Sequence, residues 1–258
     1  METCKSQEAS DLVLSLFPGI GLLDMAFEQA GFCVVRGPDL LWGGDIRRFE
    51  PPPGRFEGVI GGSPCQDFSK ARRAAPTGVG YEMIWEFRRV VLAAKPTWWL
   101  LENVPTVPDL PIPGYSWQRL DLNATQFGSP QRRIRHFQFG DIAGRYLVID
   151  RPAVKVGGDW EATVTSKTPF EVACVLQGIP AGYDLPGFTR NQAARAVANG
   201  VPLPLGLAVA EAIRDIGVNN IAQICGCGCG RPVRGKQTYA LPACRKREER
   251  RRKSGKLV

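Results

Sequence analysis

One cysteine in a glycine-flanked turn is the part of the sequence best suited to chemistry. Cys65 lies in the stretch 61–69, directly after an apolar run, 56–60, that predicts a buried strand. Pro64 fixes its own φ angle and restricts the residue before it, and the paired glycines let a ligand come close. The stretch therefore predicts a cysteine on a rigid turn at the carboxyl end of a strand, where open α/β sheets build their sites. A buried cysteine beside an ordinary turn is the alternative.

Three charged side chains lie on or just after other predicted strands. Glu102 follows an apolar run directly, and a buried carboxylate without a partner would be costly. Arg133 and Arg135 alternate in a later segment, so an extended backbone places both on one face. Two arginines on an otherwise apolar strand indicate a buried anion or carboxylate partner, whereas an exposed edge strand would leave them solvated. His136, the only histidine, points to the other face, and we interpret it as structural.

The first forty residues have the order of the nucleotide-binding half of a doubly wound sheet. A strand predicted for 11–17 runs into a glycine turn, followed by a helix over 22–30 and a second strand over 32–36. Asp39 follows this second strand, and a carboxylate there can bind both hydroxyls of a ribose. Phe17, at the tip of the first strand, could face an adenine ring or could fill the core.

Strands and helices continue to alternate along the chain, which predicts an α/β fold with a doubly wound, Rossmann-like sheet. We expect three parts: a flexible N-terminus (1–10), a catalytic domain (11–221) and a tail (222–258). Within the domain we predict helices over 82–94, 168–177, 190–198 and 203–216, strands over 97–101 and 115–122, a mobile basic loop over 70–80, and irregular chain over 138–166.

The net charge of +8 is concentrated at one end of the chain. Residues 230–258 carry 11 Lys/Arg and 2 Asp/Glu, a net +9, while residues 1–229 carry 22 and 23, a net −1. A local basic block of this kind indicates a polyanionic partner, nucleic acid first. The sequence lacks an apolar run near the ~18 residues that span a bilayer, and its polar start argues against export. We therefore expect a cytoplasmic protein without a membrane partner.

Four cysteines in the tail could hold a metal ion. Eight cysteines in a chain without an export signal favour thiols or metal ligands over disulfides. Cys225, Cys227, Cys229 and Cys244 suit one structural, tetrahedral Zn²⁺, although a reduced tail without metal is the alternative. The basic run 245–253 that follows predicts a helix or a disordered arm.

Taken together, these stretches resemble the DNA cytosine-5 methyltransferases, and most closely their short, phage-like members. The resemblance covers roughly residues 11–216, and five motifs occur in the family's order. The motifs are Phe17-Pro18-Gly19-Ile20-Gly21, Pro64-Cys65-Gln66, Glu102-Asn103-Val104, Gln131-Arg132-Arg133-Ile134-Arg135 and Asn199-Gly200-Val201-Pro202.

The resemblance implies a methyl transfer from S-adenosylmethionine to carbon 5 of a cytosine flipped out of double-stranded DNA. Cys65 would add to carbon 6 of the base, Glu102 would hold the ring nitrogen and amine, and Arg133 or Arg135 would favour the thiolate. The implied donor-binding residues are Phe17, Gly19, Ile20, Gly21, Asp39, Asp45, Ile46, Pro64, Asn199 and Val201. The enzyme would act as a monomer on DNA.

Several departures from the family pattern leave other functions open. The segment 136–166 is an abbreviated form of the part that usually recognises the target, Ser63 stands where a proline or an aromatic residue is usual, and the cysteine-rich tail lies outside the family core. An RNA (tRNA) cytosine-5 methyltransferase would use the same fold and thiol. A catalytically silent domain that carries a DNA-binding zinc module is a further alternative.

Overall fold

The structure is a computed structural model of all 258 residues. It describes residues 11–69, 75–149 and 163–217, together with short tail segments at 223–224, 227, 232–233, 238–239 and 242–253.

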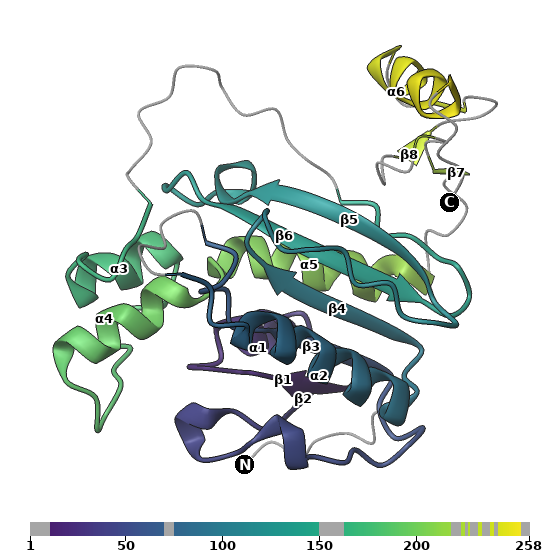
Figure 1. The fold of residues 1–258 in the computed structure, drawn as a ribbon. Helices are drawn as coiled ribbons and strands as arrows, with labels where there is room; N and C mark the ends of the chain where they lie inside the picture. Colours follow the sequence, from purple (N-terminus) through teal and green to yellow (C-terminus); the bar gives the residue numbers. More distant parts are fainter. Residues whose placement is uncertain are drawn as a thin grey trace.

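A six-stranded mixed sheet forms the centre of the described fold, in the strand order β2-β1-β3-β4-β6-β5 (Figure 1). Four neighbouring strands are parallel, and a β5–β6 hairpin adds two antiparallel strands beside β4. The strands are β1 (Leu12–Leu16), β2 (Cys33–Arg36), β3 (Gly58–Gly62), β4 (Trp98–Asn103), β5 (Ser116–Asn123) and β6 (Ile134–Asp141). The α/β fold class is therefore confirmed, with a mixed sheet.

Helices cover both faces of this sheet (Figure 1). On one face α1 and α5 pack together over a core that includes Phe27 and Val209, and on the other face α2 packs through Phe87. A third cluster joins α3 and α4 beside the start of α1. The helices are α1 (Leu22–Gln29), α2 (Val79–Ala94), α3 (Phe170–Gln177), α4 (Arg190–Asn199) and α5 (Leu203–Arg214), with short 3-10 turns η2 (Leu40–Trp42), η3 (Ile46–Arg48), η4 (Ala124–Phe127) and η5 (Asp215–Gly217).

The described tail contains a two-stranded ladder and one helix. β7 (Gln223–Ile224) pairs with β8 (Pro232–Val233), and α6 (Pro242–Lys253) contains most of the basic run. The helix confirms the helical alternative for residues 245–253, whereas the short ladder has no counterpart among the sequence predictions.

Two predicted boundaries differ from the structure for identifiable reasons. Helix α2 begins at Val79, inside the predicted loop, because the Asp67 carboxylate accepts a hydrogen bond from Gly80 N at 2.8 Å in the first turn. Strand β6 continues to Asp141, inside the segment predicted to be irregular. Its polar Gln138 is satisfied within the fold, since the side chain pairs with Leu110 N at 2.7 Å. Buried polar residues thus interrupted the apolar pattern, and the sequence pattern did not predict the end of this core strand.

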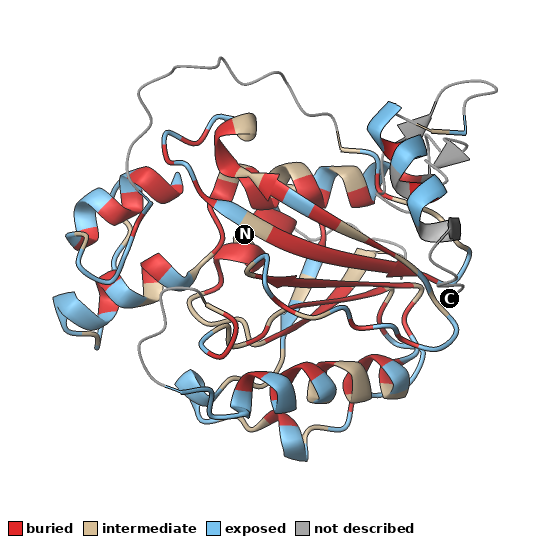
Figure 2. Cartoon of the chain, turned by 45° about the horizontal axis from the view of Figure 1, so that its top comes forward, coloured by how far each residue is buried: buried red, intermediate tan, exposed pale blue. Residues whose placement is uncertain are grey.

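One helical run, Arg190–Arg214, is long and apolar enough to cross a membrane by length and composition alone. It consists of α4 and α5, which are separated by the turn around Gly200, and 56% of its apolar window is buried in the fold. Packing against α1 and α3 accounts for its apolar surface (Figure 2).

Two adjacent tryptophans in β4 each cover a glycine of a neighbouring strand. Consecutive strand residues point to opposite faces, so Trp98 lies over Gly58 of β3 and Trp99 over Gly140 of β6. A Cβ atom at Gly58 would lie 2.2 Å from the Trp98 ring, which is buried. These two glycines therefore allow the strands to approach under bulky rings.

Gly58→Ala is expected to destabilise the protein by about 3 kcal/mol, at the upper end of overpacking costs. Chemical denaturation followed by circular dichroism measures the change. The Trp98→Leu variant lacks the ring. In that background, Gly58→Ala should lower the free energy of unfolding by less than it does in the wild-type protein. A Gly58→Ala protein as stable as wild type would show that the tryptophan can move aside.

Candidate active site

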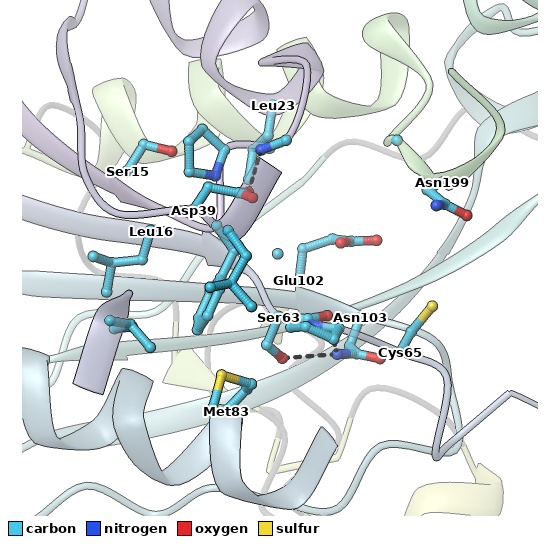
Figure 3. A pocket seen from close by; sticks show the side chains of 18 of the residues that line it. Ser15, Leu16, Leu23, Asp39, Ser63, Cys65, Met83, Glu102, Asn103 and Asn199 are labelled. Atoms are coloured by element: carbon cyan, nitrogen blue, oxygen red, sulfur yellow. Dashed lines mark hydrogen bonds between the residues drawn. The ribbon is translucent and has the colours of Figure 1, made fainter. Parts of the chain in front are cut away.

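A cavity of about 310 Å³ lies at the carboxyl ends of β1, β3 and β4. It brings together most of the residues that the sequence singled out, from segments as far apart in the chain as Phe17 and Val201 (Figure 3). Its lining includes Phe17, Gly19, Ile20, Asp39, Asp45, Ile46, Pro64, Cys65, Glu102, Arg135, Asn199 and Val201. Gly21 and Arg133 belong to the predicted set but do not line the cavity.

The turn after β1 forms one end of this cavity and has an unusual backbone. Phe17 has a φ of 54°, in the left-handed region that non-glycine residues seldom adopt, and Gly19 and Gly21 also have positive φ. Such conformations persist where the surrounding structure imposes them, often at binding sites. Here the Asp39 carboxylate holds the backbone of Gly19 in place, because it accepts a hydrogen bond from Gly19 N at 2.8 Å. Trp42 Nε1 donates to the carbonyl of the same glycine at 2.7 Å.

The polar and apolar groups at this end suit a nucleoside with a charged amino-acid tail. Asp39 also accepts from Leu41 N at 2.7 Å, so its two oxygens are held at the rim of the cavity. Asp45 accepts from Arg47 N at 3.0 Å and pairs with the Arg47 guanidinium, which keeps the pKa of Asp45 low. Apart from Gly19 and its two chain neighbours, none of the described residues has an atom within 4 Å of a Cβ placed on Gly19. Open space beside fixed carboxylates is what S-adenosylmethionine would need.

The turn that carries Cys65 is held to the neighbouring strand by an amide clamp, the side chain of Asn103. Asn103 Nδ2 donates to the Ser63 carbonyl and to Ser63 Oγ, both at 3.0 Å, and both residues are buried (Figure 3). Asn103 Oδ1 accepts from Val104 N at 2.8 Å. The turn closes when the Cys65 carbonyl accepts from Phe68 N at 3.0 Å. The clamp therefore fixes the thiol relative to Glu102, the residue just before Asn103.

Glu102 and Arg135 form a buried ion pair beside the thiol. Arg135 Nε lies 3.0 Å from Glu102 Oε1, and both side chains are almost fully buried. Burial raises the pKa of Glu102, while Arg135 and then Arg133 act in the opposite direction. Burial, and then the Glu102 charge, raises the pKa of the Cys65 thiol, whereas Arg135 lowers it. A carboxyl group that keeps its proton can donate to a ring nitrogen and also ceases to repel a thiolate.

Arg133 does not share this position, although the sequence predicted one face for both arginines. It precedes β6, which begins at Ile134, and its guanidinium donates to the carbonyls of Val164, Ala198 and Gly200. Burial lowers its pKa to about 9, with Arg135 also acting to lower it. Its charge still acts on Cys65 and Glu102, so it contributes to the field of the site without lining the cavity.

His136 is buried on the opposite face of β6, in agreement with a structural role. Its Nδ1 lies 2.6 Å from Asp121 Oδ1, and burial lowers the pKa of the imidazole.

Sequence reasoning missed several polar residues that hold the site together. Asp24 lines the cavity in the first turn of α1, fully buried, where it accepts from Ser15 Oγ at 2.5 Å and pairs with Arg36 at 3.0 Å. A buried aspartate within an apolar helix face was the available signal. Gln177, a buried residue at the end of α3, gave no such signal, because a glutamine at a helix end is common in any sequence.

Parts of the predicted site fall outside the described residues. The basic loop residues Lys70, Arg72 and Arg73 lie there, as do two of the tail cysteines, Cys225 and Cys229. Among the residues that the structure describes, no group of three or more metal-ligating side chains is found. Zinc binding therefore stays a prediction.

Asp39→Ala is expected to weaken donor binding at least about tenfold, because it removes the acceptor that holds Gly19 N as well as the carboxylate that we expect to bind the ribose. Calorimetric titration with S-adenosylhomocysteine measures the change. Asp109→Ala is a suitable control, since Asp109 is exposed and pairs with Arg119 outside the cavity. Equal affinities in the two variants would remove Asp39 from the donor site.

A thiol, an acid and a strained glycine turn at one edge of a partly parallel sheet define an α/β domain of methyltransferase type. Comparisons with known proteins agree with this class. Residues 43–111 match the family model for C-5 cytosine-specific DNA methylases. The type II methyltransferase M.HgiDI of Herpetosiphon aurantiacus is 31% identical over 163 residues, which are 51% of this chain and 52% of the relative. The M.NgoPII enzyme of Neisseria gonorrhoeae is 30% identical over 161 residues, covering 50% and 47% of the two chains.

Solved structures show the same fold at lower sequence identity. A prophage-encoded Escherichia coli protein described as a DNA modification methyltransferase matches with a TM-score of 0.61 and 15% identity, over 81% of this chain and 99% of that chain. The Dnmt2 methyltransferase of Schizosaccharomyces pombe matches with a TM-score of 0.56 and 13% identity, over 81% and 99%. The chain spans about half the length of the first two curated relatives described above. Over part of its length it is therefore similar to the C-5 cytosine-specific DNA methyltransferases.

Proposed function

We propose that this protein transfers a methyl group from S-adenosylmethionine to carbon 5 of a cytosine in double-stranded DNA. The observation that carries the proposal is the convergence of Cys65, the Glu102–Arg135 pair and the glycine turn on one cavity. When bound, the donor supplies an electrophilic methyl group on a sulfonium. The chain's own residues must supply a nucleophile, an acid and a fixed geometry between them.

Cys65 provides the nucleophile by adding its sulfur to carbon 6 of the pyrimidine, which places electron density on carbon 5. Glu102 donates a hydrogen bond to the ring nitrogen as the ring gains that density, and its raised pKa favours the protonated form. Carbon 5 would take the methyl group as the donor leaves as S-adenosylhomocysteine. A water molecule would then accept the carbon-5 proton, and the electron pair of that C–H bond would re-form the ring double bond as the carbon–sulfur bond breaks and regenerates the Cys65 thiolate. The target atom is inaccessible inside a duplex, so the cytosine must be flipped into the cavity.

A covalent trap tests this proposal directly. Duplex oligonucleotides of varied sequence that contain 5-fluorocytosine should form a stable adduct with Cys65 in the presence of the donor, because fluorine cannot leave as the proton does. Electrophoresis and peptide mass spectrometry detect the adduct. Parallel tRNA substrates test the RNA alternative, and adducts with tRNA alone would reassign the substrate. Absence of any adduct at saturating donor would contradict the mechanism.

The basic helix α6 supports DNA as the partner. Arg245, Lys246 and Arg250 are exposed on it, and basic side chains of this kind bind phosphates with a characteristic salt dependence. Replacing all three with alanine should reduce the slope of log affinity against log salt by up to about 0.9 for each lost phosphate contact. Fluorescence anisotropy measures the slope. Arg55→Ala, an exposed change beside the amino end of β3, is the control, and an unchanged slope in the triple variant would mean that α6 does not contact DNA.

Three finer points remain proposals. We propose a monomer on DNA, a cytoplasmic location, and one structural Zn²⁺ on the tail cysteines. Sedimentation and metal analysis of the purified chain test the first and the last.

A further inference from the structure

A buried polar cluster lies beneath the turn that joins α4 to α5. Gln131, Arg133 and Gln177 form this cluster, and all three side chains are almost completely buried. Gln131 Nε2 donates to Gln177 Oε1 at 2.7 Å, which links the segment before β6 to the end of α3. Buried amides of this kind keep one arrangement, because any other arrangement would leave donors or acceptors unpaired.

Gln177 also binds the turn directly through its side-chain amide. Its Nε2 donates to the Val197 carbonyl at 2.7 Å and to the Gly200 carbonyl at 3.0 Å. Arg133 Nη2 also donates to the Gly200 carbonyl, at 3.3 Å. Val197 lies in the last turn of α4, and its carbonyl also accepts from Gly200 N at 3.2 Å, so Gln177 adds a side-chain donor to this helix end. The backbone on both sides of Asn199 is thus held by one amide.

The opposite side of the same turn presses against the start of α1. A Cβ atom on Gly200 would lie 2.4 Å from Leu22 Cδ1, so this backbone approaches α1 as closely as a glycine allows. Leu22, Asn199, Gly200 and Val201 all line the cavity, whereas Gln177 does not. The turn is therefore fixed between the cluster below and α1 beside it, and its position sets the width of the cavity at this end.

From these contacts we infer that Gln177 is a positioning residue for the donor-binding end of the cavity. Its amide places the Asn199–Val201 backbone against Leu22, and thereby sets the affinity for the donor without touching it. The inference rests on the proposed function, in which this end of the cavity binds S-adenosylmethionine. Arg133 reaches both the turn and the field around Cys65, whereas the Gln177 contacts end at the turn.

Gln177→Leu tests the inference, with Gln118→Leu as a matched control. Gln118, in β5, is similarly buried. Its side-chain amide donates one hydrogen bond, to the Leu147 carbonyl at 3.1 Å, away from the cavity. Both variants lose a buried amide of the same size, so both should have a lower melting temperature. We expect the dissociation constant for S-adenosylhomocysteine to rise about tenfold in Gln177→Leu and to stay within twofold of wild type in Gln118→Leu.

Gln177→Glu is the second variant, in case the leucine protein does not fold. It keeps the acceptor for Gln131 and removes the amide that donates to Val197 and Gly200, so it should also weaken binding. The alkylation rate of Cys65 by iodoacetamide should remain at the wild-type value in both variants. Donor affinity equal to that of Gln118→Leu would overturn the inference. Failure of the wild-type protein to bind S-adenosylhomocysteine would instead overturn the donor site itself.

Discussion

Cys65→Ser is expected to lower methyl transfer by at least about 10⁴-fold while donor affinity stays within twofold of wild type. Removing a covalent nucleophile from an enzyme typically costs this much or more, because the remaining groups cannot form the intermediate. The side chain lies just after β3, while the proposed donor contacts come mainly from the turns after β1 and β2 and from the α4–α5 turn. The proposed nucleophile and the proposed donor contacts therefore come from different segments of the same cavity.

Transfer of labelled methyl groups to duplex DNA measures the first quantity, and titration with S-adenosylhomocysteine measures the second. Cys33→Ser is the matched control, since Cys33 is an exposed thiol on β2 and does not line the cavity. It should retain full activity. Substantial turnover by Cys65→Ser would contradict a covalent mechanism, and a loss of donor affinity in the same variant would mean that the two sites are not separate.

The fold could be predicted well from the sequence where local pattern decides the structure. The runs that became β1, β3 and β4 are short, mostly apolar and followed by turn or polar residues, as is typical of buried parallel strands. Glu102 was recognisable because a carboxylate at the end of such a run needs a buried partner, and Arg135 supplies it at 3.0 Å. Chemistry-bearing residues at strand ends are thus visible before the fold is known.

The remaining parts of the site depend on contacts between distant segments. Arg133 and Arg135 look equivalent in sequence, yet one meets three backbone carbonyls and the other meets Glu102, because β6 begins between them. Gln177 lies 46 residues from its partner Gln131, and no periodicity connects them. Gln138 was not predicted to lie in a strand, because its polar side chain is buried only by virtue of a hydrogen bond from Leu110 N, in a distant loop. Side-chain partners across the fold cannot be inferred from local pattern.

Glu102→Gln is expected to lower methyl transfer by about 10²- to 10⁴-fold, the usual contribution of a general acid. Glutamine keeps the size of the side chain and can still donate through its amide, but it cannot give up a proton to the ring. Burial raises the pKa of Glu102, so the wild-type carboxyl holds its proton to higher pH than an exposed glutamate would. The acid form is therefore stabilised where the reaction needs it, and activity should decline as pH rises through this raised pKa.

The same substitution should lower the pKa of the Cys65 thiol. After burial, the Glu102 charge is the larger cause that raises this pKa, and a neutral glutamine removes it. Arg135→Gln should have the opposite effect, because the Arg135 charge stabilises the thiolate. The midpoint of iodoacetamide alkylation, followed against pH by mass spectrometry of the Cys65 peptide, should therefore move down in Glu102→Gln and up in Arg135→Gln.

Opposite shifts in the two variants would show that the carboxyl and the guanidinium act on the sulfur through their charges. If a variant lost its fold, the alkylation midpoint of that variant would instead move toward the midpoint of an exposed thiol. Melting curves identify such a loss of folding independently. Shifts in the same direction, with both proteins folded, would contradict the electrostatic account. Because alkylation needs neither DNA nor donor, it separates the tuning of the nucleophile from base flipping and from methyl transfer. The Glu102–Arg135 pair would then have two separable functions, as the proton donor to the base and as the charge balance that decides when Cys65 can attack.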